Sequence, residues 1–335
     1  MIHALHAPDG FLSAPVAFAT AFISILVVGF ALRQSGRELK DKQVPLAGIA
    51  AAFIFAAQMF NFPVATGTTG HLLGGALAAI LLGPATGALV VTIVVVVQAL
   101  LFADGGLSAL GYNVFNMAIV TAFGGYAVFL LARRLMPRNT GGIIGAAGLA
   151  AAASVVLSAM AFSVEWLFGA TAPIDFDNVF SAMVGVHLLI GIGEGLISAL
   201  AIGAVLASRS DLVYGVADLD RSVLAERTPV PMRTFVAGGL LAAIVMATVV
   251  SQFAVDNPDG LETVAENEGF ADQAEDHLLD SSVFADYATS GVANESVSLA
   301  IAGFSGTALT LAVGYGLART TGRRRESTTR ETATA

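Results

Sequence analysis

The chain lacks cysteine and carries few charges. Without cysteine, disulfide bonds, iron–sulfur clusters and thiolate metal sites are excluded, and only histidine, carboxylate or backbone atoms remain as metal ligands. Charged residues make up 12% of the 335 residues, whereas apolar residues make up 56% and the mean hydropathy is +0.79. These values exclude a soluble globular domain and predict a chain that folds in a lipid bilayer.

Several sequence motifs are also missing. No G-x-x-x-x-G-K-[ST] loop occurs, so any ATP hydrolysis would have to come from separate subunits. No H-E-x-x-H motif of a metalloprotease occurs either. The net charge of −9 and the lack of a basic cluster disfavour a nucleic-acid partner. We expect no organic cofactor and no enzymatic activity in this chain.

Apolar runs alternate with polar or Gly/Pro breaks, and each run predicts a membrane-spanning helix. A single straight helix over residues 71–102 would be about 48 Å long, against a hydrocarbon core of about 30 Å. Gly83, Pro84 and Gly87 provide a break in that stretch, so we divide it into two short spans. The nine predicted spans are residues 11–32, 44–60, 71–83, 86–102, 113–131, 143–168, 180–207, 234–254 and 298–318.

The distribution of basic residues predicts the orientation. With nine spans and the N-terminus outside, all 16 Lys and Arg lie on the cytoplasmic side, and merging two spans would break this pattern. We therefore expect an all-α, multi-pass protein of the plasma membrane, with seven helices in one bundle, a C-terminal two-helix hairpin and a cytoplasmic C-terminus. Composition divides the chain into a membrane domain (1–208), a cytoplasmic linker (209–233), a two-span module (234–320) with an acidic external loop (255–297), and a basic and polar tail (321–335).

The external loop of the two-span module is strongly acidic. Eleven Asp and Glu residues lie between Asp256 and Glu295. Such a field can concentrate divalent cations near the outer face, or it can be a solvating surface of the kind that salt-loving organisms use. The sequence leaves both interpretations open.

Histidines mark the outer side of the predicted bundle. The N-terminal arm, MIHALHAPDGFL, carries His3 and His6 close to the chain's own amine, and His71 lies at the outer end of the third span. A terminal amine, an ionised backbone amide and an imidazole can chelate one ion in a plane. Nitrogen ligands in a plane suit Ni(II) and Cu(II) and can suit Co(II), whereas Mg(II), Ca(II) and Mn(II) prefer oxygen.

Four separated segments occur in a characteristic order: HAPDGFLS (6–13), QMFNFPVATGTTGHLLGGALAAILLGP (58–84), QALLFADGGLSALGYNVFNMA (98–118) and HLLIGIGEGLISA (187–199). They resemble the CbiM/NikM family, the substrate-binding membrane components of energy-coupling-factor transporters for cobalt and nickel. The segment NPDGLE (257–262) resembles the small NikN-type component, which is fused to the binding component in some members. The resemblance implies a transmembrane coupling protein and a pair of cytoplasmic ATPases as partners, besides the lipid bilayer.

The resemblance also implies a set of metal ligands. In the family the ion is held by the N-terminal amine, by the amide and imidazole of a histidine in position two, and by a later histidine. Carried over, the imidazoles are those of His6 and His71. His6 is residue six, however, so we hypothesise that Leu5 is an alternative start or a processed terminus and supplies the backbone amine. Alternatively, the Met1 amine and His3 form a chelate that does not need His71.

The cargo expected from this ligand set is Ni²⁺ or Co²⁺. Nickel is favoured because the arm, the TTGHLLGG loop and the fused PDGLE segment look nearer to nickel-type members. Seven polar residues at outer span ends could orient the imidazoles, although loop capping and helix–helix hydrogen bonding explain most of them better. They are Gln58, Asn61, Thr68, Thr69, Gln98, Asn113 and Asn116.

Two other functions remain open from the residues. His187 and Glu194 are seven apart on one predicted helix face and form a possible intramembrane polar pair, either in a structural hydrogen bond or in an ion- or proton-coupled secondary carrier that uses Glu194. More remotely, Ser305 in the segment GFSG could pair with His187 in an intramembrane serine hydrolase.

Overall fold

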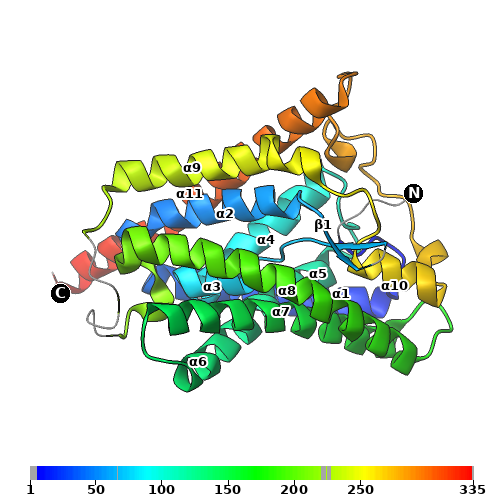
Figure 1. Cartoon of the computed structure of the whole chain (residues 1–335), viewed down its shortest axis with the longest axis horizontal. Helices are drawn as coiled ribbons and strands as arrows, with labels where there is room; N and C mark the ends of the chain where they lie inside the picture. The colour runs from blue at the N-terminus through cyan, green and yellow to red at the C-terminus, as the bar shows by residue number, and fades with distance from the viewer. Residues whose placement is uncertain (1–5, 66, 220–223, 225–227, 334–335) are drawn as a thin grey trace.

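Long helices running side by side make up most of the computed structural model, which describes residues 6–65, 67–219, 224 and 228–333 (Figure 1). The longer helices are α1 (Ala14–Glu38), α4 (Pro84–Leu101), α7 (Thr140–Gly169), α8 (Phe176–Arg209), α9 (Met232–Thr248) and α11 (Glu295–Ala333). The shorter ones are α2 (Val44–Gln58), α3 (Gly75–Leu82), α5 (Leu110–Asn113), α6 (Gly125–Leu135) and α10 (Gly260–Glu268), and a π-helix, η2 (Val114–Gly124), joins α5 to α6.

Each of the nine apolar runs contains a helix, and the expected all-α membrane fold is confirmed. Within the described residues, seven helical stretches are long and apolar enough to cross a membrane. The other two apolar runs contain the shorter helices α2, with 15 residues, and α3, with 8. The only sheet in the described part of the chain is the small hairpin of β1 (Phe62–Ala65) and β2 (Thr68–Gly70). The orientation in the membrane stays a prediction.

The third run differs from its prediction as a helix over 71–83. His71 lies in a non-helical segment, and α3 begins only at Gly75. The Glu194 carboxylate accepts hydrogen bonds from the backbone N–H groups of Leu73 (2.6 Å) and Gly74 (2.9 Å), and the Gln58 side-chain amide donates to the Leu73 carbonyl (3.1 Å). These side chains satisfy backbone groups that a helix would otherwise have paired, which is why this segment can be non-helical among apolar helices.

The predicted break between the third and fourth runs is present. Gly83 has a φ of +90°, which favours glycine, and Pro84 is the first residue of α4. The ring of Tyr214, from the linker after α8, packs against Gly83. The short helix α3 of about 12 Å and the extended segment before it together take the chain from the β-hairpin to the linker side.

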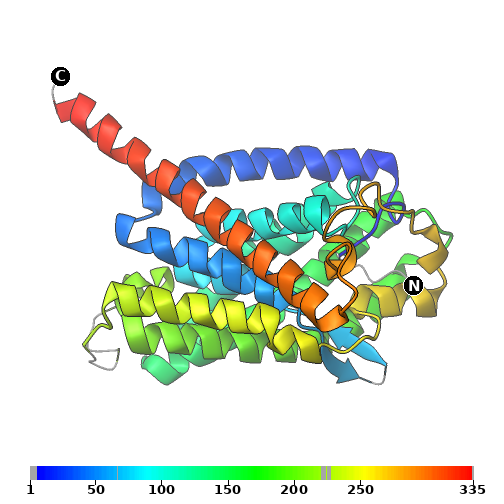
Figure 2. The ribbon, with the colours of Figure 1, turned by 90° about the horizontal axis from the view of Figure 1, so that it is seen from above.

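The C-terminal two-helix hairpin packs onto α2. In Figure 2, α11 crosses α2 diagonally, between α1 and α9. Small residues allow this approach, since a Cβ on Gly314 would lie 2.9 Å from the Cβ of Ala51 and a Cβ on Gly239 would lie 2.8 Å from Ile49. The hairpin therefore covers α2, most of whose residues are buried.

The two ends of the bundle carry different elements. The strand β1, helix α10 and the start of α1 lie at one end, which is the right-hand end in Figure 1. The last turns of α11 lie at the opposite end. The N-terminal arm and the acidic segment of the C-terminal module are thus at the same end, which we call the arm end.

Candidate metal centre

The N-terminal arm is fixed to the loop between α4 and α5 by one carboxylate. Asp9 accepts hydrogen bonds from the backbone N–H groups of Leu107 (3.1 Å), Ser108 (2.6 Å) and Ala109 (3.2 Å), and from the Ser108 hydroxyl (2.6 Å). Gly10, with a φ of +93°, then turns the chain, and a Cβ there would lie 2.1 Å from a backbone oxygen. The sequence Pro-Asp-Gly therefore sets the path of the arm.

Three further hydrogen bonds join the arm to the same loop and the helix after it. The Gly106 N–H and the Asn113 amide both donate to the Ala7 carbonyl, at 3.1 and 2.9 Å. The Tyr112 hydroxyl donates to the Pro8 carbonyl at 2.9 Å. Residues 6–9 are buried as a result, and the side chain of His6 is completely covered.

The two histidines predicted as metal ligands lie next to each other. The ring centroids of His6 and His71 are 5.8 Å apart, with an angle of 60° between the ring planes. Both rings line a cavity of about 70 Å³. Burial lowers the pKa of His6 below its usual value of 6.5, so its imidazole is neutral at neutral pH and able to bind a cation.

Each imidazole has a buried carboxylate beside it. His6 Nδ1 is 3.7 Å from Asp104 Oδ1, and His71 Nε2 is 3.6 Å from Asp259 Oδ2. Asp104 follows α4 in the first domain, whereas Asp259 belongs to the NPDGLE segment of the C-terminal module. Within the described residues no three His, Asp or Glu side chains form a cluster that could hold one ion, so the groups are arranged as two pairs.

The Asp104 carboxylate is held by the C-terminal module. The Tyr287 hydroxyl donates to Asp104 Oδ2 at 2.5 Å, and the Gln98 amide donates to the Tyr287 oxygen at 2.9 Å. Burial and the nearby Asp104 raise the pKa of Tyr287, so the hydroxyl keeps its proton and remains a donor. Gln98 was predicted to orient an imidazole. Its connection to His6 is indirect and runs through Tyr287 and Asp104.

The other predicted polar residues take different places. Asn113 and Asn116 line the cavity, and Asn116 also donates to the Glu165 carboxylate at 2.7 Å. Thr69 bonds to the Asn257 and Pro258 carbonyls at 2.9 and 3.1 Å, and so connects β2 to the C-terminal module. Asn61 and Thr68 are not among the described residues that line the cavity.

His187 and Glu194 have separate partners. His187 Nδ1 lies 2.7 Å from the Met183 carbonyl and so donates to it, and the ring lines the same cavity as His6 and His71. Glu194 instead holds the segment after His71, as described above. The structural interpretation of Glu194 therefore has direct support, and its hydrogen bonds run to backbone groups rather than to His187.

The sequence analysis did not predict Asp104, Asp259 or Glu165 as residues of the site. The first two were visible as acidic residues within the ADGG and PDGLE segments, yet nothing local indicates that segments about 150 residues apart meet. Glu165 lies inside the apolar run of α7, where an ionisable residue is itself a signal. The alternative ligands Met1, His3 and Leu5 lie outside the described residues.

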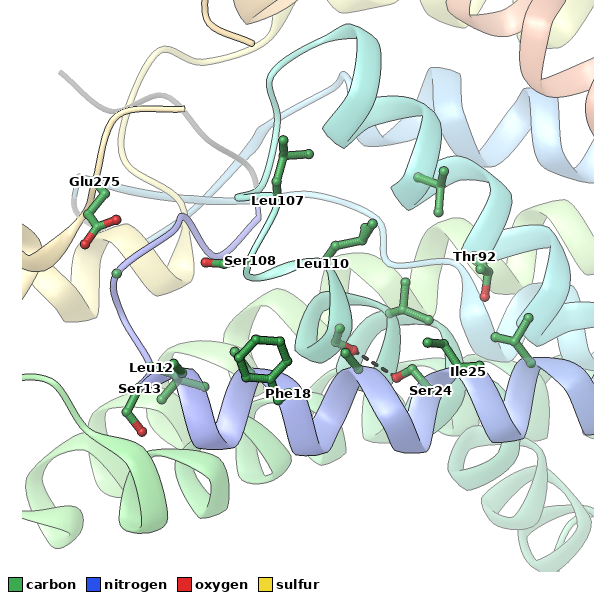
Figure 3. A pocket seen from close by; sticks show the side chains of 18 of the residues that line it. Leu12, Ser13, Phe18, Ser24, Ile25, Thr92, Leu107, Ser108, Leu110 and Glu275 are labelled. Atoms are coloured by element: carbon green, nitrogen blue, oxygen red, sulfur yellow. Dashed lines mark hydrogen bonds between the residues drawn. The ribbon is translucent and has the colours of Figure 1, made fainter. Parts of the chain in front are cut away.

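A second feature, a groove of about 920 Å³ along α1, is not part of this centre. Figure 3 shows apolar side chains such as Leu12, Phe18 and Ile25 along it, and none of the histidines that the structure describes lines it. The exposed apolar residues of α1 include Phe18 and Phe22, at 76% and 64% exposure. Such a face is expected where a helix meets lipid.

Comparison with known proteins gives two matching family models. Residues 6–212 match the family described as the cobalt uptake substrate-specific transmembrane region, CbiM. Residues 233–323 match the PDGLE domain.

Relatives match the chain over one or both of these regions. A putative fused nickel transport protein, NikMN, of Archaeoglobus fulgidus is 34% identical over 94% of this chain and 98% of its own length. A putative metal transport protein of Haloquadratum walsbyi is 41% identical over 63% of this chain and 94% of its own. A crystal structure of a truncated transition metal transporter matches with a TM-score of 0.54 and 31% identity, over 60% of this chain and 98% of the other.

Proposed function

Since the chain belongs to the CbiM family of nickel and cobalt transport components and carries a PDGLE domain, we propose that it captures one Ni²⁺ or Co²⁺ ion at the arm end and serves as the substrate-binding subunit of an ATP-driven importer. The transport component is a multi-pass membrane protein. The ion is its cargo rather than a resident cofactor.

One observation carries this proposal. Imidazoles from segments 65 positions apart in the sequence lie with ring centroids 5.8 Å apart, both buried in one small cavity. His71 Nδ1 lies 3.2 Å from the Leu72 carbonyl, and with its proton donated there the ring would bind a metal through Nε2. The bonds from Asp9 and Asn113 hold His6 in place before any ion arrives.

The N-terminal arm would supply the remaining nitrogen ligands. If the mature chain starts at Leu5, the terminal amine and the amide of His6 lie in the chelating position, and the His6 imidazole closes the chelate with His71 as fourth ligand. If the chain starts at Met1, the amine and His3 chelate the ion, and His71 is dispensable. Intact-mass analysis of the purified protein distinguishes the two starts.

ATP would be used by other subunits. The chain lacks a phosphate-binding loop, and the family resemblance implies a transmembrane coupling protein and two ATPases. A secondary carrier that protonates Glu194 would need to release the two backbone N–H groups that this carboxylate binds. Those bonds favour the ATP-driven alternative.

Nickel is our preferred cargo. The relative that covers nearly the whole of this chain is named as a nickel transport protein, although the family model is named for cobalt. Planar nitrogen ligands favour Ni(II) strongly, whereas Co(II) tolerates them together with oxygen. The choice is tested by growing cells with equal Ni and Co and measuring both metals in the purified chain.

The same measurement on variants tests the site. We expect one metal ion per wild-type chain and almost none in His6→Ala or His71→Ala. His277→Ala is the control, because His277 lies at the same end but does not line the cavity. Full metal content in both His6→Ala and His71→Ala would contradict the proposed site, and full content in His71→Ala alone would support the Met1 and His3 chelate.

A further inference from the structure

The C-terminal module places one carboxylate oxygen inside the metal cavity. Asp259 is the N-cap residue of α10, and its Oδ1 accepts the Glu262 N–H at 2.8 Å. The other oxygen, Oδ2, faces His71 Nε2 at 3.6 Å. The Asp259 side chain is only 6% exposed, so this carboxylate is buried inside the protein.

The His71 nitrogen that faces Asp259 is Nε2. His71 Nδ1 is directed to the Leu72 carbonyl, which leaves Nε2 on the side of the carboxylate. With metal–ligand bonds of about 2.1 Å, a nitrogen and an oxygen on one ion are about 3.0 Å apart at a right angle and about 4.2 Å apart in line. The observed separation of 3.6 Å lies between these limits.

The position of Asp259 is fixed by contacts on both sides. The Thr69 N–H and hydroxyl both bond to the Pro258 carbonyl, at 2.9 and 3.1 Å. A Cβ on Gly260 would lie 2.5 Å from Ile190 and 3.1 Å from the His187 ring, so only glycine allows this close approach. The carboxylate is therefore held against the cavity rather than left on a loose loop.

An acidic cavity adjoins the metal cavity on the side of α10. It has a volume of about 110 Å³, and three of its lining residues are acidic: Asp256, Glu262 and Glu266. His6 and Leu261 line both cavities. Within the described residues neither ring nitrogen of the buried His6 has a hydrogen-bond partner.

We propose that Asp259 is a cation ligand, which with His71 forms a mixed nitrogen and oxygen seat that receives the divalent ion from the acidic cavity. This inference rests on the proposed function, because the ion is the same Ni²⁺ or Co²⁺ cargo. The seat combines a residue of the first domain with one of the PDGLE module, so the module is part of the metal site. Oxygen ligation also explains how a hydrated ion can be held while its water is replaced by nitrogen ligands.

The test uses the purified full-length chain in detergent and Co²⁺ alone as the probe. Visible absorption of bound Co²⁺ reports its ligand set, and stopped-flow mixing gives the loading rate. For Asp259→Asn we expect loading at least about tenfold slower and a changed cobalt spectrum. Asparagine keeps the helix cap, so α10 should stay intact. Asp259→Glu should restore part of the rate, and Asp272→Asn, an exposed residue of the same segment, should behave as wild type.

The single tryptophan shows whether the module stays docked. The ring of Trp166 on α7 lies 4.5 Å from that of Phe270, which follows α10. Unchanged tryptophan emission in Asp259→Asn, together with slower loading and an altered spectrum, supports ligation. A wild-type loading rate and cobalt spectrum in Asp259→Asn would overturn the proposal. Slow loading with shifted tryptophan emission in both Asp259→Asn and Asp259→Glu would also overturn it, because the shifted emission would mean that the module is no longer docked.

The variants distinguish a failure of the role of Asp259 from a failure of the proposed function. If His71→Ala abolishes Co²⁺ binding while Asp259→Asn loads normally, the site is correct and the role of Asp259 is wrong. If His6→Ala and His71→Ala both bind Co²⁺ as wild type does, the proposed site itself fails.

Discussion

The two ends of the bundle are held together in different ways. At the arm end, buried hydrogen bonds join the two modules, as between Thr69 and the Pro258 carbonyl and between Tyr287 and Asp104. At the opposite end, a buried hydrogen bond from Gln43 to the Leu212 carbonyl and partly exposed ion pairs join the helices to the linker after α8. There the side chains of Lys42 and Asp211 are 43% and 23% exposed, and the side chain of Asp218, bound to Arg133, is 64% exposed.

This contrast indicates where the structure tolerates change. A buried polar group that loses its partner costs about 1–3 kcal/mol, whereas an exposed ion pair contributes about 0–1 kcal/mol. The arm end should therefore be sensitive to single substitutions in both stability and metal binding. The linker end should be more tolerant.

The largest effect is expected for Asp9→Ala at the arm end. The substitution removes the acceptor of four hydrogen bonds, three of them from backbone N–H groups of residues 107–109. We expect a loss of about 2–4 kcal/mol in the free energy of unfolding and at least a hundredfold weaker Ni²⁺ binding, because His6 is no longer held. Thermal unfolding and equilibrium Ni²⁺ binding measure the two effects, and wild-type affinity would show that the arm does not position the site.

A smaller loss is expected for Glu194→Gln. Glutamine has one carbonyl oxygen in place of the two carboxylate oxygens that accept from Leu73 and Gly74. One buried N–H should lose its acceptor, at a cost of about 1–3 kcal/mol, and the displaced His71 should bind Ni²⁺ about tenfold more weakly. If Ni²⁺ binding and stability remain normal while uptake by cells stops, Glu194 carries protons and the secondary-carrier alternative is correct.

Tyr287→Phe should have a still smaller effect. The ring keeps its packing on Phe102, at 5.0 Å between centroids, but the hydroxyl between Asp104 and Gln98 is lost. We expect a loss of about 1–2 kcal/mol and a few-fold lower affinity for Ni²⁺, because the Asp104 carboxylate beside His6 loses a donor. Equilibrium unfolding and Ni²⁺ titration test this, with Tyr315→Phe on the outer face of α11 as the control, and equal behaviour of the two variants would contradict a role for Tyr287.

The smallest effect is expected for Asp218→Asn at the linker end. Arg133 lowers the pKa of Asp218, so their pair stabilises the folded chain above about pH 4 and loses its contribution as the pH falls further. At neutral pH the variant should lose less than about 1 kcal/mol, and Ni²⁺ binding should not change. A loss of Ni²⁺ affinity would break the contrast between the two ends.

Apolar periodicity and charge were sufficient to predict the helices. A bilayer requires each backbone group to be paired locally, so an apolar run almost always forms a helix, and all nine runs contain one. The exception is the segment of His71. Its backbone is paired by Glu194 and Gln58, from other helices, and no local pattern records such long-range partners.

The candidate metal centre was predictable only in part. His6 and His71 carry the residue type and the family motif, and their proximity in the structure agrees with that expectation. Asp259 belongs to an acidic segment in which many residues look alike, whereas Asp104 is a single carboxylate in an otherwise apolar stretch. Only the packing of the two modules shows that both are buried. A single sequence gives the type of a residue, whereas burial beside a distant imidazole depends on tertiary contacts.

The most direct test of the account is X-ray absorption at the Ni K-edge of the purified, nickel-loaded chain. Imidazole rings give characteristic multiple scattering, so the number of bound histidines can be counted. We predict two imidazoles in the wild type and a loss of one of them in His71→Ala at saturating nickel. A spectrum that shows only oxygen ligands, or one that is unchanged in His71→Ala, would contradict the account.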